Sequence, residues 1–216
     1  MNHKIPKIIH QIWIGDRDMP DHCRRYVDKM KLLHQDWEVK LWGNEVFDIY
    51  SDDEFLNHWM THPDPGGHLK WAFISDRIRL LLLRDFGGIY VDVDAQPIRS
   101  FNMILEELPP EPTFFAGMKQ SQEDFTLIDC TVYGSAPNSR GVDVALSTYT
   151  DINRVNGCKM FCEKLIEEMA PDIALFGYRY FYNDNPDDKK CVVLHDVEGR
   201  LHSWGEPEQQ HWNYRK

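Results

Sequence analysis

The sequence has no apolar run of the roughly 18–20 residues that a membrane-spanning helix requires. Its first residues, 1–6, also lack the hydrophobic segment of a signal peptide. No internal repeat, low-complexity tract or domain boundary is recognisable along the chain. From these absences we expect a cytoplasmic protein without a transmembrane segment, or one domain of a longer protein.

Positive charge is also scarce. The 216 residues include 24 Lys and Arg against 35 Asp and Glu, which gives a formal net charge of −11. This balance argues against nucleic acid or an anionic membrane surface as the main partner, because either would be repelled. An anionic ligand would need local positive charge, such as a bound metal ion and an arginine.

Cysteines are few and scattered. There are five of them, an odd number, and no Cys-x-x-Cys pair occurs. This pattern favours reduced thiols in a cytosolic setting over a disulfide framework. The five are Cys23, Cys130, Cys158, Cys162 and Cys191.

The composition is otherwise that of an ordinary globular protein, with 42% hydrophobic and 27% charged residues. A chain of this length can bury roughly two-thirds to three-quarters of its unfolded surface in one core. We therefore expect residues 1–216 to form a single domain.

Strands and helices alternate along the first hundred residues, as judged from apolar periodicity. Such alternation is typical of an α/β fold with a central, mainly parallel sheet flanked by helices. A loop over 134–141 is expected to reach over the functional site. We expect strands over 7–14, 37–42, 89–93, 113–118, 125–133 and 191–195, and helices over 20–33, 45–60, 71–86, 102–108 and 157–170. The segment 45–60 is either one helix or two that are separated by a break near Ser51.

The most informative stretch is residues 75–94, which predicts a helix, a Gly87-Gly88 stop and a strand that ends in two carboxylates. Because side chains alternate along a strand, Tyr90, Asp92 and Asp94 should share one face. Two neighbouring carboxylates repel unless a positive charge lies between them, and a divalent cation with oxygen ligands would satisfy both. The alternative is a solvated acidic turn.

Three motifs stand out in the first hundred residues: Ile5-Pro6-Lys7-Ile8-Ile9-His10-Gln11-Ile12-Trp13-Ile14-Gly15, then Ser75-Asp76-x-x-Arg79, then Gly87-Gly88-Ile89-Tyr90-x-Asp92-x-Asp94. Together they resemble the motifs of nucleotide-sugar glycosyltransferases of the Asp-x-Asp type. The match is to family 32 and, more distantly, to the glucosylating domains of large clostridial toxins. It covers about the first hundred residues, whereas the remainder of the chain is only loosely similar.

The resemblance implies a single-domain nucleotide-diphospho-sugar transferase fold of the GT-A type. It also implies metal-dependent transfer of a hexose from a nucleotide diphosphate sugar to a glycan, glycoprotein or other hydroxyl acceptor, with retention of configuration. UDP-glucose or another UDP-hexose is the expected donor, and GDP-mannose is the alternative. The expected cofactor is Mn²⁺ or Mg²⁺.

Metal-ligand roles follow from the same resemblance. Asp94 is the expected metal ligand and a catalytic residue. Asp92 is expected to bind the metal through water or to contact the donor ribose. His202, which precedes Ser203-Trp204, is the expected third ligand, with His195 as a rival.

The remaining donor-binding roles also come from the resemblance. Asp76 and Arg79 are expected to contact the donor sugar or diphosphate and to be catalytic, although their spacing also suits a surface ion pair. Trp13 is expected to stack on the base, unless it only packs in the core. Arg77 and Arg84 are expected to be solvated. The full expected nucleotide-sugar set is Ile12, Trp13, Ser75, Asp76, Arg79, Tyr90, Asp92, Ser203 and Trp204.

Two other functions compete with this one. The first is a phosphotransferase with an Asp-x-Asp nucleophile, although such a motif belongs near the first strand and is followed by Thr or Val. Here Ala95-Gln96 follows a motif that lies ninety residues into the chain. The second is a catalytically silent module that binds nucleotide-sugars or carbohydrates, since binding and turnover would use the same metal site.

Overall fold

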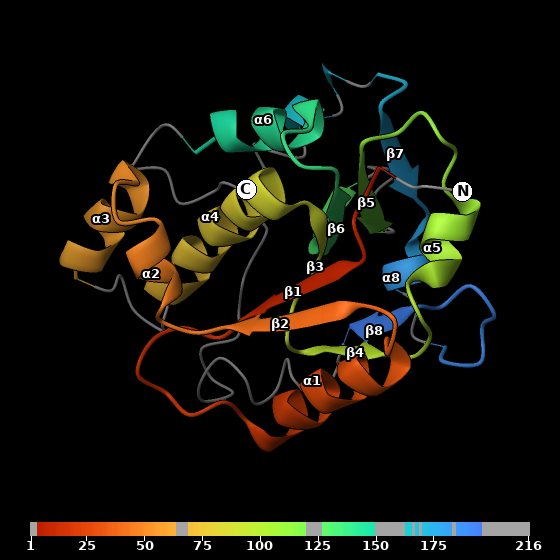
Figure 1. Ribbon diagram of the computed structural model, residues 1–216, viewed down its shortest axis with the longest axis horizontal. Coiled ribbons are helices and arrows are strands. Elements are labelled where there is room, and N and C mark those ends of the chain that lie inside the picture. The colour runs from red at the N-terminus through yellow and green to blue at the C-terminus, as the bar shows by residue number, and fades with distance from the viewer. Residues whose placement is uncertain are drawn as a thin grey trace.

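The computed structural model describes residues 4–63, 69–119, 127–149, 163–165, 167–168, 170–182 and 185–195. Strands and helices alternate through its first half (Figure 1). The elements are β1 (Ile8–Ile12), α1 (Asp21–Leu33), β2 (Glu38–Trp42), α2 (Val46–Ile49), α3 (Glu54–Thr61), α4 (Leu69–Phe86), β3 (Gly88–Val91), β4 (Ala95–Pro97), α5 (Asn102–Glu107), β5 (Phe114–Lys119), β6 (Leu127–Ser135), α6 (Arg140–Ser147), β7 (Ile173–Phe176), α8 (Tyr178–Phe181) and β8 (Val193–His195).

The central sheet has the strand order β2-β1-β3-β6-β5-β7. β1 pairs in parallel with both β2 and β3, and β5 pairs in parallel with β7. β6 is antiparallel to its neighbours β3 and β5, so it alone runs against the other described strands of this sheet. The predicted α/β fold with a mainly parallel sheet is confirmed. A separate antiparallel pair is formed by β4 and β8.

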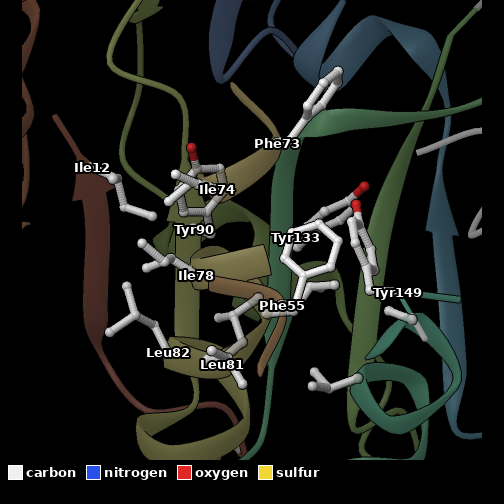
Figure 2. Close-up of a cluster of buried hydrophobic side chains, with 14 of the residues drawn as sticks. Ile12, Phe55, Phe73, Ile74, Ile78, Leu81, Leu82, Tyr90, Tyr133 and Tyr149 are labelled. Carbon is white, nitrogen blue, oxygen red and sulfur yellow. The ribbon is translucent and has the colours of Figure 1, made fainter. Parts of the chain in front are cut away.

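Helices cover both faces of the sheet, with α4 and α6 on one side and α1 on the other (Figure 1). Within β3, Tyr90 belongs to the apolar cluster on the α4 side, whereas Ile89 and Val91 belong to the opposite cluster with α1 and α5. This is the alternation that a strand buried on both faces requires. Figure 2 shows Ile74 and Ile78 of α4 beside Tyr90. Among the described helices, none has the length and apolarity needed to cross a membrane.

The predicted glycine stop ends α4 and begins β3. Gly87 and Gly88 have φ values of +63° and +97°, a region that side chains with a Cβ rarely adopt. A Cβ on Gly88 would lie 2.4 Å from the carbonyl oxygen of Ile8 in the adjacent strand. Glycine is therefore required here both for the turn and for close pairing with β1.

Some predicted elements are confirmed and others need correction. The helical segment 45–60 breaks near Ser51, as one of the two interpretations held, and Asp53 begins the second helix by accepting a hydrogen bond from Leu56 N at 3.0 Å. The loop expected over the site is wrong, because Ser135 lies in β6 and Arg140 opens α6. Between them, Asn138 N donates to Arg84 O at 2.8 Å, at the end of α4 that leads into β3 rather than at the carboxyl end of β3. The helix expected over 157–170 lies largely outside the described residues.

Two expectations about single side chains are also wrong. Cys130 is disulfide-bonded, with its partner outside the described residues, so not all thiols are reduced. Arg77 is not solvated: its Nη2 atom lies 2.9 Å from Asp53 Oδ2, and both side chains are largely buried. Arg77 thereby ties α4 to the start of α3.

His10 of β1 is fully buried and held as a neutral imidazole. Trp42 Nε1 donates to His10 Nδ1 at 3.1 Å, so the His10 Nε2 proton is the one that faces Gly87 O at 2.8 Å. Burial, assisted by nearby Lys40, lowers the pKa of His10 to about 4. Hydrogen bonding to Gly87 and the charge of Glu38 oppose this shift without cancelling it.

Protonation of His10 should therefore oppose folding. The unfolded chain binds this proton near the ordinary pKa of 6.5, whereas the folded chain binds it only near pH 4. The free energy of unfolding should therefore decrease as the pH falls from about 6.5 toward 4. The limiting slope is about 1.4 kcal/mol per pH unit. In urea unfolding, the free energy of unfolding of wild type should fall with acidification more steeply than that of His10→Gln. His62→Gln, at an exposed position at the end of α3, controls for the loss of an imidazole as such. Equal slopes for wild type and His10→Gln would contradict this account.

Candidate active site

A cavity of about 310 Å³ opens at the carboxyl ends of β1 and β3. Because these strands are parallel neighbours, the residues that follow them meet at one edge of the sheet. Trp13 follows β1, Asp92 follows β3, and α4 crosses the same edge. The cavity is lined by Ile12, Trp13, Ile14, Asp16, Arg17, Cys23, Trp71, Ala72, Ser75, Asp76, Arg79, Tyr90, Asp92, Val93, Asp94, Cys130, Thr131 and Tyr182.

The floor of the cavity is organised by the Arg79 guanidinium. Its Nη2 atom lies 2.7 Å from Asp76 Oδ1, and its Nη1 atom lies 3.4 Å from Asp92 Oδ1. Nη1 also donates to Cys130 O of β6 at 2.5 Å, and the guanidinium lies 4.5 Å from the centre of the Tyr90 ring. The Arg79 side chain is only 8% exposed. Asp76 and Arg79 thus form a largely buried ion pair and not a surface ion pair.

Tyr90 fixes one oxygen of Asp92. The Tyr90 hydroxyl donates to Asp92 Oδ1 at 2.6 Å, and the Asp92 backbone N–H donates to Thr131 O at 3.0 Å. Burial raises the pKa of Tyr90, and the charge of Asp92 raises it further against the opposing effect of Arg79. The phenol therefore stays protonated and remains a hydrogen-bond donor. Tyr90 and Asp92 share a face, as the strand alternation predicts.

Burial and neighbouring charges shift the pKa values of both Asp76 and Arg79. Burial raises the pKa of Asp76 to about 6, where Arg79 opposes the shift and Asp92 adds to it. For Arg79, burial lowers the pKa, but the electrostatic effects of Tyr90, Asp92 and Asp76 outweigh it and the net shift is upward. At neutral pH the guanidinium is charged, and Asp76 is mostly ionised.

The acidic turn after β3 has a donor set that suits a hard divalent cation. Asp92 and Asp94 both line the cavity, and carboxylate oxygens are the ligands that Mg²⁺ and Mn²⁺ prefer. The described residues contain no group of three potential metal ligands, so two carboxylates are what this part of the chain offers. His202, Ser203 and Trp204 lie outside the described residues.

The alternative third ligand, His195, ends β8. In the β4–β8 pair, its backbone lies opposite Ala95, which directly follows Asp94. The fold therefore brings the backbone of His195 next to the acidic turn, although the two are about a hundred residues apart in sequence.

The other end of the cavity is formed by the loop after β1. Trp13 is half-buried and packs on the apolar cluster of Met19, Cys23, Val27 and Val93. Its indole N–H donates to Arg17 O at 2.8 Å, which closes the loop on itself. Ile12, which is expected to bind the nucleotide-sugar, lines the cavity and also belongs to the α4-side core.

Sequence patterns did not reveal two residues that hold this loop. Asn44 accepts from Gly15 N at 2.9 Å and donates to Gly15 O at 3.0 Å. Gly15 has a φ of +101°, and a Cβ there would lie 2.9 Å from Cε2 of Trp71, a wall of the cavity. In the sequence, Trp71 fits the apolar face of a helix and Asn44 fits a surface turn. Neither pattern signals these contacts.

The fold is that of GT-A type glycosyltransferases, and an Asp-x-Asp motif lies at the carboxyl end of its central strand β3. Residues 20–111 match the family described as "Glycosyltransferase sugar-binding region containing DXD motif". This match spans less than half of the chain. It confirms the predicted resemblance and the predicted enzyme class, a glycosyltransferase.

Individual relatives agree with this assignment. An uncharacterised glycosyltransferase of Acanthamoeba polyphaga mimivirus is 25% identical over 93% of this chain and 84% of its own length. A mannosyl phosphorylinositol ceramide synthase of Saccharomyces cerevisiae is 30% identical over 113 residues, which cover 49% of this chain and only 28% of the yeast protein.

Solved structures support the fold. A glycosyltransferase involved in the glycosylation of the major capsid of PBCV-1 aligns with a TM-score of 0.55 over 95% of this chain and 98% of its own. The two chains are 9% identical, so the likeness concerns the fold alone.

Removing the Arg79 charge should destabilise the fold. Arg79→Gln leaves Asp76 and Asp92 without their shared cation, and an uncompensated buried charge costs about 3 kcal/mol or more. Arg84→Gln is the matched control, because Arg84 pairs with Asp85 at a more exposed position and should change the free energy of unfolding by less than about 1 kcal/mol. Chemical denaturation near neutral pH measures both.

A double substitution sharpens this test. Arg79→Gln together with Asp76→Asn should be less destabilising than the sum of the two single changes, because one unpaired carboxylate is removed. Simple additivity would show that Arg79 and Asp76 do not stabilise each other.

Proposed function

We propose that this chain transfers a hexose from a nucleoside diphosphate sugar to a hydroxyl acceptor on a glycan or glycoprotein, in a reaction that requires a divalent cation. The observation that supports this most is the meeting of Trp13, Asp76, Asp92 and Asp94 in one cavity, at the strand edge where α/β folds bind nucleotides.

Each part of the donor can be matched to the cavity residues whose chemistry suits it. A flat base suits the indole of Trp13 at one end, since stacking on an aromatic ring contributes about 1–3 kcal/mol. The diphosphate suits the acidic turn once a cation is bound between them. The sugar then lies toward α4, where Ser75 and Asp76 offer oxygen atoms to its hydroxyl groups.

Asp94 and Asp92 are the residues that would hold Mn²⁺ or Mg²⁺, with His202 or His195 as the third protein ligand. When bound, the cation would act as a Lewis acid that stabilises the leaving nucleoside diphosphate. Tyr90 keeps Asp92 Oδ1 in place through its hydrogen bond, and no described residue is bonded to Asp92 Oδ2. Asp92 therefore offers a positioned second oxygen to the cation or to a donor ribose.

The other residues of the site bind and orient the donor. Asp76 is mostly ionised at neutral pH and can accept hydrogen bonds from sugar hydroxyls. Arg79 holds Asp76 and Asp92 in place and keeps positive charge beside the transferred sugar. We propose retention of the anomeric configuration, which needs no dedicated general base.

We propose a UDP-hexose such as UDP-glucose as the donor. The mannosyl transfer in the name of the yeast relative supports GDP-mannose as the second candidate. Titration of both nucleoside diphosphates in the presence of Mn²⁺ separates these candidates.

The metal role of Asp94 can be tested directly. Asp94→Asn should lower Mn²⁺-dependent turnover of the donor at least about a hundredfold, because Lewis-acid stabilisation of the leaving group contributes several kcal/mol. Asp92→Asn should have a smaller effect. Asp48→Asn removes an exposed carboxylate outside the cavity and is the matched control. Wild-type turnover in Asp94→Asn after metal chelation would exclude this role.

Metal and nucleotide should also bind with positive coupling. Without a cation, Asp92 and Asp94 repel the diphosphate, so each ligand should raise the affinity of the other by the same factor. Calorimetry should show that Mn²⁺ strengthens UDP or GDP binding at least about tenfold, or about 1.4 kcal/mol. Trp13→Ala should weaken nucleoside diphosphate binding and leave binding of Mn²⁺ alone nearly unchanged. Equal nucleotide affinity with and without Mn²⁺ would contradict the proposed site.

A further inference from the structure

Carboxylates outnumber cations in the cavity. Among its described lining residues, Asp16, Asp76, Asp92 and Asp94 carry negative charge, and two arginines carry positive charge. A nucleoside diphosphate sugar would bring two further negative charges into the same space. A single divalent cation cannot balance this excess, so the positive side chains of the cavity decide how well the diphosphate is held.

One of the two arginines, Arg79, is already engaged. Its guanidinium contacts Asp76, Asp92 and Cys130 O, and its side chain is 8% exposed. Turning it toward a diphosphate would break these contacts and leave the two carboxylates unpaired. Arg79 therefore neutralises carboxylates of the protein itself and is not available to the diphosphate.

The other arginine, Arg17, is differently placed. Its side chain lines the cavity and is exposed. Within the part of the chain that the structure describes, no carboxylate forms an ion pair with it, although Asp16 and Asp18 flank it in sequence. Its charge is thus available to an anionic ligand.

The backbone that carries Arg17 is held at two points. Trp13 Nε1 donates to Arg17 O at 2.8 Å, and Asn44 makes its two hydrogen bonds to Gly15 two residues earlier. The backbone of Arg17 therefore lies beside the indole on which the base is proposed to stack. In a nucleoside diphosphate sugar the anionic part is the diphosphate, and only the ribose separates it from the base.

We propose that Arg17 is a further donor-binding residue that contacts the diphosphate, in addition to the cation that Asp92 and Asp94 would hold. A guanidinium suits this role because its planar donors match phosphate oxygens in pairs and it stays charged at any working pH. The inference rests on the proposed function, since it requires a nucleoside diphosphate in this cavity.

The test compares three variants of the full chain with wild type. Arg17→Gln removes the charge, Arg17→Lys keeps it, and Arg25→Gln removes the same charge from an exposed position of α1 that lines no part of the cavity. Affinities for UDP and GDP are measured by calorimetry at saturating Mn²⁺, at about 0.05 M and about 0.5 M NaCl, since salt screens exposed charges. Thermal unfolding of each variant checks that it is folded.

At low salt, Arg17→Gln should weaken nucleoside diphosphate binding about five- to tenfold, as expected for a lost charge-assisted hydrogen bond. Arg17→Lys should stay within about threefold of wild type, because the charge remains. Arg25→Gln should change nothing, and the deficit of Arg17→Gln should shrink at high salt. This combination would establish the contact.

Other results would overturn the inference. If Arg17→Gln binds as tightly as Arg25→Gln, Arg17 does not contact the diphosphate. If Arg17→Gln and Arg17→Lys are equally weakened and salt has no influence, the side chain acts through packing and not through charge. In both cases wild type still binds the nucleotide, so the proposed function stands. Failure of wild type to bind UDP or GDP with Mn²⁺ would overturn the proposed function as well.

Discussion

Arg79 joins three parts of the fold that are far apart in sequence. It extends from α4, pairs with Asp76 on the same helix, reaches Asp92 after β3 and bonds to Cys130 O in β6. Burial of the Arg79 guanidinium without partners would be unfavourable. Its buried position therefore requires the contacts with Asp76, Asp92 and Cys130 O. The floor of the cavity exists because these contacts form together.

The backbone of the site depends on close pairing between β1 and β3. Gly88 allows β3 to approach Ile8 so closely that no side chain fits between them, and the register then places His10 beside Tyr90. From that pairing, Trp13 and Asp92 must leave the sheet at the same edge. The loop after β1 and the acidic turn after β3 thus meet because of backbone pairing.

Local patterns were enough to predict the elements that carry the motif, and distant contacts explain what was missed. Alternation along β3 correctly placed Tyr90 and Asp92 on one face. The burial of Arg79 could not be predicted, because its acceptor Cys130 O lies 51 residues away. Helix α6 was missed because Gly141 suits a loop. In the fold, a Cβ there would lie 2.4 Å from Cγ of Phe114, so packing explains the glycine.

The two arginines of the cavity have different roles: Arg79 stabilises the fold, and Arg17 is proposed to bind the donor. Arg79 holds Asp76 and Asp92, so a loss of activity on replacing it would report on the positions of those carboxylates as much as on contact with a donor. Arg17 forms no ion pair within the described residues, and its anchoring contacts are made by backbone atoms of its loop. Its side chain can therefore be changed with little effect on the fold. In a protein with a net charge of −11, an unengaged cation in the same cavity as the acidic turn would attract a diphosphate into that cavity.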